Sequence, residues 1–291
     1  MSQTLYPHLD PRAPISKEMH MNSLTPNADA AVLYERRGHI GVITLNRPDN
    51  RNSMTPELLE AFSAATRAAQ DDEKQGLRCV LITGKGRCFS AGADFRSNIQ
   101  VADESRYTPP HERSFGMYGP FLSLRDLQVP VVAALNGHAV GGGFGLSLMA
   151  DLRVANKDAK YGANFARLGL HPGMAVGWVL PRIVGVQRAA ELLFTGRLFM
   201  GAEGAEIGYA LEAVAADEVM NRAWQLAEQI AGNAPIAVKM MKRTFYDGLQ
   251  WDPAQAAWQE AWAQAVTVDT DDAKEGMQAL LDKRPPQFEG R

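Results

Sequence analysis

The sequence predicts an α/β fold that is followed by a helical C-terminal region. Three observations support this prediction. Short apolar runs alternate with helical patterns as far as about residue 215, as repeated strand–helix units produce. Several of these runs are apolar at nearly every position, which is expected of strands buried on both faces. From about residue 217 onward the pattern is helical only.

The chain divides into three regions by composition. Residues 1–30 scatter prolines among polar residues and show no strand or helix period, so we expect either a flexible arm or a segment that docks on a neighbouring subunit. Residues 31–216 form the predicted α/β core, and residues 217–291 form the helical region. With 291 residues, of which 46% are hydrophobic, the chain is long enough to bury a core without disulfides or a structural metal.

The core begins with a strand at residues 40–45 and continues with a helix that starts at Thr55. A hydroxyl at the N-cap, Pro56 at the first helical position and Glu57 in the first turn are typical signals of a helix start. The apolar stripe of this helix consists of Leu58, Leu59, Phe62, Ala65 and Ala69.

Later elements follow the same alternation. Strands are expected at residues 78–83, 131–135 and 152–155, with a helix at residues 141–150 before the last of them. In the C-terminal region, Pro235 and Pro253 each mark a helix start. Trp258 and Trp262 are four residues apart and share one helical face, which would pack either in the core or at a subunit interface.

Composition excludes several classes of protein. Thirty basic and 33 acidic residues give a formal net charge of −3, which gives no support to a nucleic-acid binder. No apolar run approaches the ~18 residues that cross a bilayer, and no signal peptide opens the chain. Cys79 and Cys88 have no metal-ligand spacing and are interpreted as reduced thiols. We therefore expect a cytoplasmic protein that uses no metal and does not bind membranes.

Two glycine-rich segments follow predicted strands, at residues 84–94 and 136–145. Neither has the glycine pattern of a dinucleotide-binding loop, the Gly-Lys-Ser/Thr ending of a P-loop or the Gly-x-Ser-x-Gly elbow of a serine hydrolase. Such loops can direct backbone N–H groups to one point. Two of them together would form an oxyanion hole for a carbonyl oxygen that becomes an enolate. The alternative is that both are simply tight strand-to-helix turns.

These segments carry a resemblance to a known family. Residues 88–94, 136–143 and 150–151 resemble motifs of the enoyl-CoA hydratase/isomerase (crotonase) superfamily, as do residues 45–48 and 275–281. The resemblance implies a crotonase-like spiral of ββα units with a C-terminal helical oligomerisation region, assembled as a homotrimer or a dimer of trimers. It also implies an acyl-CoA thioester substrate and no separate cofactor, because coenzyme A is part of the substrate.

The resemblance assigns a role to particular residues. The backbone N–H groups of Ala93 and Gly142 would hold the thioester carbonyl oxygen. The substrate path would be lined by Ala91, Gly92, Ala93 and Asp94, with Phe165 beside the acyl group. Lys239, Lys242 and Phe288 lie in regions that often contact coenzyme A in this family, although the lysines could equally belong to a solvated helix face.

The acids that the family's hydratases use are missing. One glutamate position falls at Gly145 and the other at Phe165, and a third position, which carries an acid in some isomerases and dehalogenases, falls at Gly173. Glycine and phenylalanine cannot transfer a proton, whereas water addition needs acid and base groups. We therefore expect no efficient hydration of short enoyl-CoA thioesters.

Other residues are candidates to replace the acids. His171 is a candidate acid or base, because an imidazole with its ordinary pKa suits proton transfer; otherwise it packs or caps the turn before Pro172. A polar segment at residues 103–113 could close over the acyl group. Candidates from this segment and just beyond it are Tyr107, His111, Glu112 and Tyr118. His138 is interpreted as structural, and Asp94 and Asp151 as carboxylates that fix loops.

Three hypotheses about function remain open at this point. The first is a crotonase-type enzyme that stabilises a thioester enolate and carries out hydration or isomerisation, by family analogy. The second is a non-catalytic acyl-CoA binding protein. The third is a hydrolase or carbon–carbon lyase that acts on a dicarbonyl substrate through His171 and a water molecule.

Overall fold

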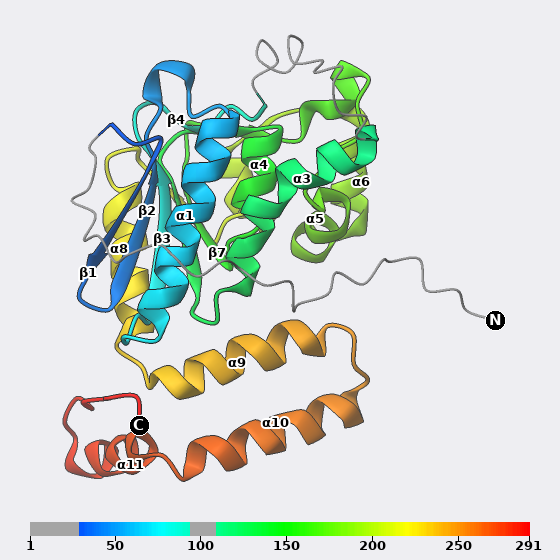
Figure 1. The fold of residues 1–291 in the computed structure, drawn as a ribbon. Coiled ribbons are helices and arrows are strands. Elements are labelled where there is room, and N and C mark those ends of the chain that lie inside the picture. The colour runs from blue at the N-terminus through cyan, green and yellow to red at the C-terminus, as the bar shows by residue number, and fades with distance from the viewer. Residues whose placement is uncertain (1–28, 94–108) are drawn as a thin grey trace.

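The computed structural model describes residues 29–93 and 109–291. Within them, the chain forms two sheets (Figure 1). The larger sheet has the strand order β1 (Val32–Arg37), β2 (Ile40–Leu45), β3 (Cys79–Gly84), β5 (Val131–Leu135), β7 (Leu152–Asn156) and β10 (Glu212–Val214). The smaller sheet has the order β4 (Cys88–Ser90), β6 (His138–Val140), β8 (Lys160–Gly162) and β9 (Phe199–Met200). Most of the predicted arm, residues 1–28, lies outside the described residues.

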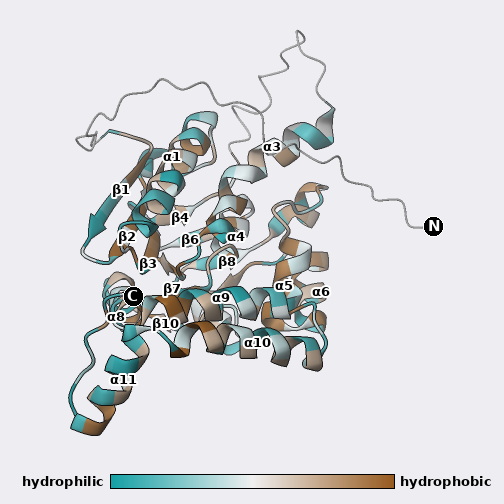
Figure 2. Ribbon diagram, turned by 60° about the horizontal axis from the view of Figure 1, so that its bottom comes forward, coloured by the Kyte–Doolittle hydropathy of each residue, from teal (hydrophilic) through white to brown (hydrophobic). Residues whose placement is uncertain are grey.

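The larger sheet is parallel except for the β1–β2 hairpin, and it is buried on both faces, as predicted. Alternate residues of β2 and β3 belong to two separate hydrophobic clusters. Helix α1 (Pro56–Glu73) packs on one face, and α8 (Val219–Ala231) covers the other with a stripe of small residues (Figure 1). Figure 2 shows the hydrophobic character of these strands.

The start of α1 forms as the sequence predicts. The Thr55 side chain accepts a hydrogen bond from the backbone N–H of Leu58, and Pro56 stands at the first helical position. Helix α4 (Gly142–Ser147) is shorter than the predicted range of 141–150. Its glycines are poor helix formers, which is consistent with the early end.

The smaller sheet arises from a repeated chain path. After β3, β5 and β7, the chain leaves the larger sheet, makes a short turn and enters the smaller sheet as β4, β6 and β8, respectively. Because β4, β6 and β8 are parallel neighbours, their carboxyl ends lie at one edge of the smaller sheet. The segments that follow these strands are therefore brought together.

The remaining helices complete the core and form the C-terminal region. They are α3 (Pro110–Leu122), α5 (Val176–Val184), α6 (Val186–Thr195), α7 (Gly201–Glu206), α9 (Pro235–Gly248), α10 (Pro253–Val268) and α11 (Asp271–Asp282), with short 3-10 helices η1 (Pro48–Asn50), η2 (Ser123–Asp126) and η3 (Asn164–Leu168). Pro235 and Pro253 begin α9 and α10, as predicted. None of the described helices is long and apolar enough to cross a bilayer.

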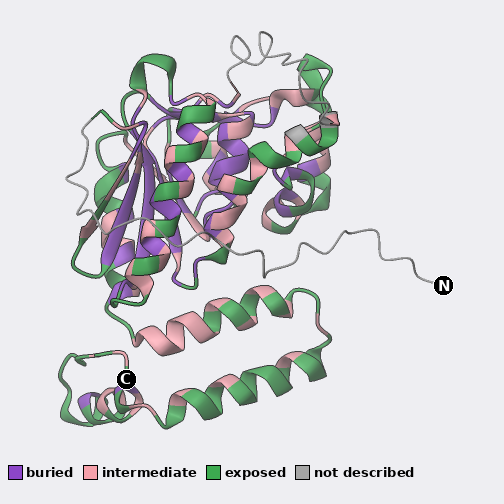
Figure 3. Ribbon diagram, in the orientation of Figure 1, coloured by how far each residue is buried: buried purple, intermediate pink, exposed green. Residues whose placement is uncertain are grey.

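Helices α9 and α10 run side by side below the sheet layers, and α10 has no buried residue (Figures 1 and 3). The side chains of Trp258 and Trp262 are 69% and 65% exposed in the single chain. The interpretation of these two tryptophans as core residues is therefore wrong. Helix α9 is tied to the core through Asp151, whose carboxylate accepts hydrogen bonds from Lys242 Nζ at 2.8 Å and from the Tyr246 hydroxyl at 2.6 Å.

Candidate active site

The two glycine-rich segments meet at the carboxyl ends of β4 and β6. Gly92 has a φ of +86°, which favours glycine, and its backbone lies directly against the second segment. A Cβ atom at residue 92 would lie 2.7 Å from the carbonyl oxygen of Val140 and 2.8 Å from the nitrogen of Gly142. The two loops therefore touch, and a side chain between them would force them apart.

Ala93 and Gly142 line the same cavity. Among the described residues, neither backbone N–H donates a hydrogen bond to an acceptor. Ala93 pairs with Met54 through an isolated parallel bridge, in which the Met54 N–H donates to the carbonyl of Gly92 at 2.9 Å. Two backbone donors beside one cavity suit an oxygen atom on which negative charge develops.

Asn52 and Ser90 fix the first of these loops from beneath. The Asn52 side-chain amide donates to the carbonyls of Cys88 and Phe89 at 2.9 and 3.1 Å. Ser90 Oγ donates to the carbonyl of Asn52 at 2.8 Å and accepts from the N–H of Gly92 at 3.2 Å. Neither residue stands out in the sequence as part of a site. Asn52 has a φ of 54°, and asparagine in a short polar turn is the signal that could have indicated it.

A buried arginine supports the second loop. Arg153 donates to the carbonyls of Ser147 and Ala150, at 3.3 and 2.7 Å, just after the last turn of α4. Its Nε donates to the carbonyl of Tyr209 at 2.6 Å. Burial lowers the pKa of Arg153, although the nearby Tyr209, Tyr246 and Asp151 act in the opposite direction. The guanidinium thus satisfies carbonyl groups that a short helix leaves without partners.

The cavity beside the two loops has a volume of about 250 Å³ and is largely apolar. Its apolar side chains include Met54, Leu59, Met117, Leu170, Met174 and Val176. Its polar side chains, among the residues that the structure describes, are Ser114, Tyr118 and His171. A carboxylate is absent from this described lining, so the cavity suits an uncharged acyl group.

Gly145, Phe165 and Gly173, the three positions that the resemblance singles out for acids, all line this cavity. A Cβ atom at Gly145 would lie 3.1 Å from Met174 Sδ and 3.3 Å from Val176 Cγ2, so apolar side chains cover that position. Phe165 follows β8 on η3, and its ring lies near Gly141. At Gly173, a Cβ atom would lie 2.3 Å from the hydroxyl oxygen of Tyr118.

His171 lines the exposed side of the cavity. Its Nδ1 lies 2.7 Å from the carbonyl oxygen of Pro172. Because a carbonyl oxygen only accepts hydrogen bonds, we assign the ring proton to Nδ1. In the neutral ring, Nε2 then carries the lone pair and can accept a proton.

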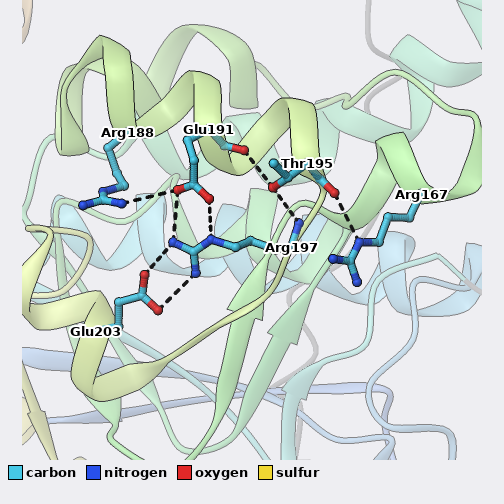
Figure 4. Close-up of polar contacts among 6 residues, drawn as sticks. All are labelled: Arg167, Arg188, Glu191, Thr195, Arg197 and Glu203. Carbon is cyan, nitrogen blue, oxygen red and sulfur yellow. Dashed lines mark hydrogen bonds and ion pairs between the residues drawn. The ribbon is translucent and has the colours of Figure 1, made fainter.

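The segment that carries Phe165 and His171 is anchored by a network of charged residues (Figure 4). Arg167, on η3, donates to the carbonyl of Thr195 at the end of α6 at 3.2 Å. Arg197 pairs with Glu191 of α6 and, at 2.6 Å, with Glu203 of α7. The hydrogen bonds from Arg197 lower the pKa of Glu191. The network therefore joins η3, α6 and α7.

Several sequence candidates lie away from the cavity. His138 begins β6, and its Nδ1 accepts the N–H of Lys160 at 2.8 Å. Burial, and then the nearby Lys160, Arg87 and Arg51, lower its pKa. Asp151 accepts the N–H of Val131 at 2.6 Å and holds α9.

The remaining candidates fall into two groups. Those that do not contribute to the described lining of the cavity are Ala91, Gly92, Lys239, Lys242, Phe288, His111 and Glu112. Asp94 and Tyr107 lie outside the described residues. Helix α3 starts at Pro110, and its residue Tyr118 does reach the cavity.

Comparisons with known proteins give matches to one family. A family model described as enoyl-CoA hydratase/isomerase matches residues 35–291. The short-chain-enoyl-CoA hydratase of Clostridium acetobutylicum is 33% identical over 87% of this chain and 95% of that protein. The mitochondrial enoyl-CoA hydratase domain-containing protein 2 of Mus musculus is 36% identical over 94% of this chain and 92% of that protein. The crystal structure of the enoyl-CoA hydratase from Bacillus anthracis matches with a TM-score of 0.83 and 33% identity, over 90% of this chain and 100% of that chain.

Proposed function

The chain belongs to the enoyl-CoA hydratase/isomerase family, and from this premise we propose that it forms the enolate of an acyl-CoA thioester by moving a proton at the α-carbon. The family membership confirms the resemblance that the glycine-rich motifs carry, and the structural match confirms the predicted crotonase-like fold. One observation supports the proposal most strongly: Ala93 and Gly142, whose backbone N–H groups have no acceptor among the described residues, line one apolar cavity.

The two donors supply the electrostatic part of the reaction. The thioester carbonyl oxygen accepts both N–H groups, and these bonds strengthen as the α-proton leaves and charge moves onto the oxygen. Removal of one such donor typically costs about 3 kcal/mol of transition-state stabilisation. Coenzyme A enters as part of the substrate, along the stretch from Ala91 to Asp94, and the acyl group occupies the cavity beside Phe165.

Efficient hydration is not part of the proposal. Gly145 and Phe165 stand where the hydratases of the family carry glutamates, and both line a largely apolar cavity. An added water molecule would have no carboxylate from the described lining to activate it. A turnover of crotonyl-CoA comparable with that of typical hydratases would contradict this part of the proposal.

His171 is the proposed base. The hydrogen bond from Nδ1 to the carbonyl of Pro172 leaves Nε2 to accept the α-proton. We expect His171→Ala to lower proton exchange at the α-carbon by about 100-fold or more, because general bases contribute at least this much. Binding of saturated acyl-CoA, measured by calorimetry, should remain. Unchanged exchange in this variant would remove His171 from the mechanism.

The decisive experiment uses saturated and unsaturated acyl-CoA thioesters in deuterated water, with their masses followed over time. Deuterium uptake at the α-carbon, or a product of changed mass, supports enolate formation. Binding without uptake by any thioester would favour the second hypothesis, an acyl-CoA binding protein. Cleavage of a β-dicarbonyl thioester that depends on His171 would favour the third, a hydrolase or carbon–carbon lyase.

The proposed active form is a homotrimer or a dimer of trimers. The exposed tryptophans of α10 and the other exposed apolar residues of α9 and α11 support it, because monomers rarely expose so many large apolar side chains together. The contacts of Lys239, Lys242 and Phe288 with coenzyme A also remain a proposal. In the single chain, Lys242 is engaged by Asp151 and by the carbonyl of Val129.

A further inference from the structure

Tyr118 occupies the space that an acidic side chain at residue 173 would need. Helix α3 directs Ser114, Met117 and Tyr118 to the cavity from one face, because residues three and four apart are neighbours on a helix. A Cβ atom at Gly173 would lie 2.3 Å from both the hydroxyl oxygen and Cζ of Tyr118, and 2.8 Å from Cε1. The phenol and a side chain at residue 173 therefore exclude each other.

The Tyr118 hydroxyl is available to a ligand. Among the described residues it has no hydrogen-bond partner, and Tyr118 is half-buried against the wall of the cavity. A phenol also suits this apolar surrounding better than a carboxylate does, because an ionised acid loses more hydration on burial. The cavity thus holds one uncharged proton donor at the place of a missing acid.

We propose that Tyr118 donates the proton that the α-carbon of the thioester enolate receives, an inference that rests on the proposed function. His171 first removes the α-proton, and the C–H electron pair moves into the enolate held by Ala93 and Gly142. The enolate then collapses to the thioester: its electron pair forms the new C–H bond with the Tyr118 proton, and the O–H electrons stay on the phenolate. The phenolate regains a proton from solvent water, and His171 returns its proton to solvent.

The first test is Tyr118→Phe, which keeps the ring over Gly173 and removes only the unpartnered hydroxyl. With butyryl-CoA in deuterated water, we expect α-carbon exchange to fall by at least about 100-fold, in the range of general acid catalysis. The dissociation constant of butyryl-CoA should change by less than about threefold, because the donor acts only after the enolate forms. Tyr34→Phe is the matched control: its hydroxyl donates to Asp72, neither residue lines the cavity, and exchange should be unchanged.

The second test uses the mutual exclusion of the two positions. We expect Tyr118→Ala to lose exchange at the α-carbon. In the double variant Tyr118→Ala/Gly173→Asp, the exchange rate should be at least about tenfold higher than in Tyr118→Ala, because the carboxyl group can then enter the vacated space. Gly173→Asp alone should gain nothing, because the phenol blocks the side chain. A merely structural role of Tyr118 would not produce this rescue.

The outcomes separate the two proposals. Exchange by the wild type together with unchanged exchange in Tyr118→Phe would overturn the role of Tyr118 and leave the proposed function intact. A parallel loss of exchange and of butyryl-CoA binding would overturn it as well, because Tyr118 would then be a binding residue. The absence of exchange in the wild type, with every thioester that binds, would overturn the proposed function and this inference with it.

Discussion

Met54 lies beneath the proposed carbonyl site. A Cβ atom at residue 142 would lie 2.6 Å from Met54 Sδ and 3.5 Å from the Cα of Gly92. A methionine thioether is flexible and can move aside, whereas the backbone of Gly92 cannot. Substitution at residue 142 therefore acts on the site more than on the fold.

We expect Gly142→Val to fold and to lose acyl-CoA binding by at least about tenfold, because its side chain enters the space of the thioester carbonyl. Calorimetric titration with butyryl-CoA measures this, and circular dichroism checks the fold. Gly177→Val is the matched control, since a Cβ atom there meets nothing within 4 Å. Equal affinity of both variants would show that the carbonyl does not bind at Gly142.

At the residue scale, the position of the two glycine-rich loops could be predicted from the sequence, and side-chain partnerships could not. These loops follow strands and are visible as local motifs, and the resemblance then points to Ala93 and Gly142, which line one cavity. The contact between Tyr118 and Gly173 joins segments that are far apart in the chain, so no local pattern indicates it. Asn52 and Ser90 form ordinary polar turns in the sequence, and only the fold brings them under the loop of Gly92.

At the scale of elements, Arg153 holds a short helix in place. Helix α4 has six residues and several glycines, so its own hydrogen bonds provide little stability. The buried guanidinium supplies donors to the carbonyls of Ser147 and Ala150. The position of Gly142 therefore depends on a side chain from the neighbouring strand.

We expect Arg153→Met to reduce the free energy of unfolding by about 3 kcal/mol, because it leaves buried carbonyls without donors. Denaturant titration followed by fluorescence measures the loss. The same substitution at the exposed position 243, Arg243→Met, should reduce the free energy of unfolding by less than about 0.5 kcal/mol. Similar losses in the two variants would refute the anchoring role.

The C-terminal tail is held against α11 by hydrogen bonds and an ion pair to carboxylate side chains. Glu275 accepts the N–H of Gln287 at 2.8 Å and pairs with Arg284 at 2.6 Å. Hydrogen bonds from Arg284 and then from Gln287 lower the pKa of Glu275 to about 2. A carboxylate whose pKa is lower in the folded than in the unfolded state stabilises the fold above its ordinary pKa, and this stabilisation disappears as the pH falls through the folded value.

The stabilisation by Glu275 should therefore be complete at about pH 6 and decline between about pH 4.5 and pH 2. We expect the stability difference between the wild type and Glu275→Gln to shrink over this interval. Denaturant unfolding at several pH values measures it, with Glu260→Gln on the exposed surface of α10 as the control. A difference that stays constant with pH would contradict the assignment.

Element prediction succeeded where local signals were strong. Helix α1 combines a cap, a proline at its first position and an apolar stripe, and it forms where expected. Strands β4, β6 and β8 have three residues each, too few to show a period. Helix α3 contains Gly116, Gly119 and Pro120, so the sequence did not indicate a helix there.

At the scale of the whole molecule, α10 presents an apolar face to solvent. Trp258, Ala261, Trp262, Ala265 and Val266 recur at helical spacing along it, and α10 is exposed over its length (Figure 3). Sequence periodicity identified the shared face of the tryptophans. It did not distinguish core from interface, because both need the same apolar pattern.

We expect the double variant Trp258→Ser/Trp262→Ser to form smaller assemblies than the wild type, because it removes the largest apolar side chains from this face. Light scattering after size-exclusion chromatography measures the mass. Gln264→Ser, on the same helix, should leave it unchanged. A wild type that is already monomeric, or a double variant of the same mass, would contradict the proposed interface.

The proposed carbonyl site consists of main-chain N–H groups, and this has an evolutionary consequence. Every residue except proline has a backbone N–H group, so the donors at Ala93 and Gly142 do not depend on a particular side chain. Substitutions elsewhere in the cavity can therefore remove an acidic side chain without removing the capacity to polarise a thioester. A lineage can thus exchange one reaction for another while its descendants inherit the same activated carbonyl. For protein engineering, a library randomised at residues 118, 145, 165, 171 and 173 would sample new reactions of the same activated thioester carbonyl.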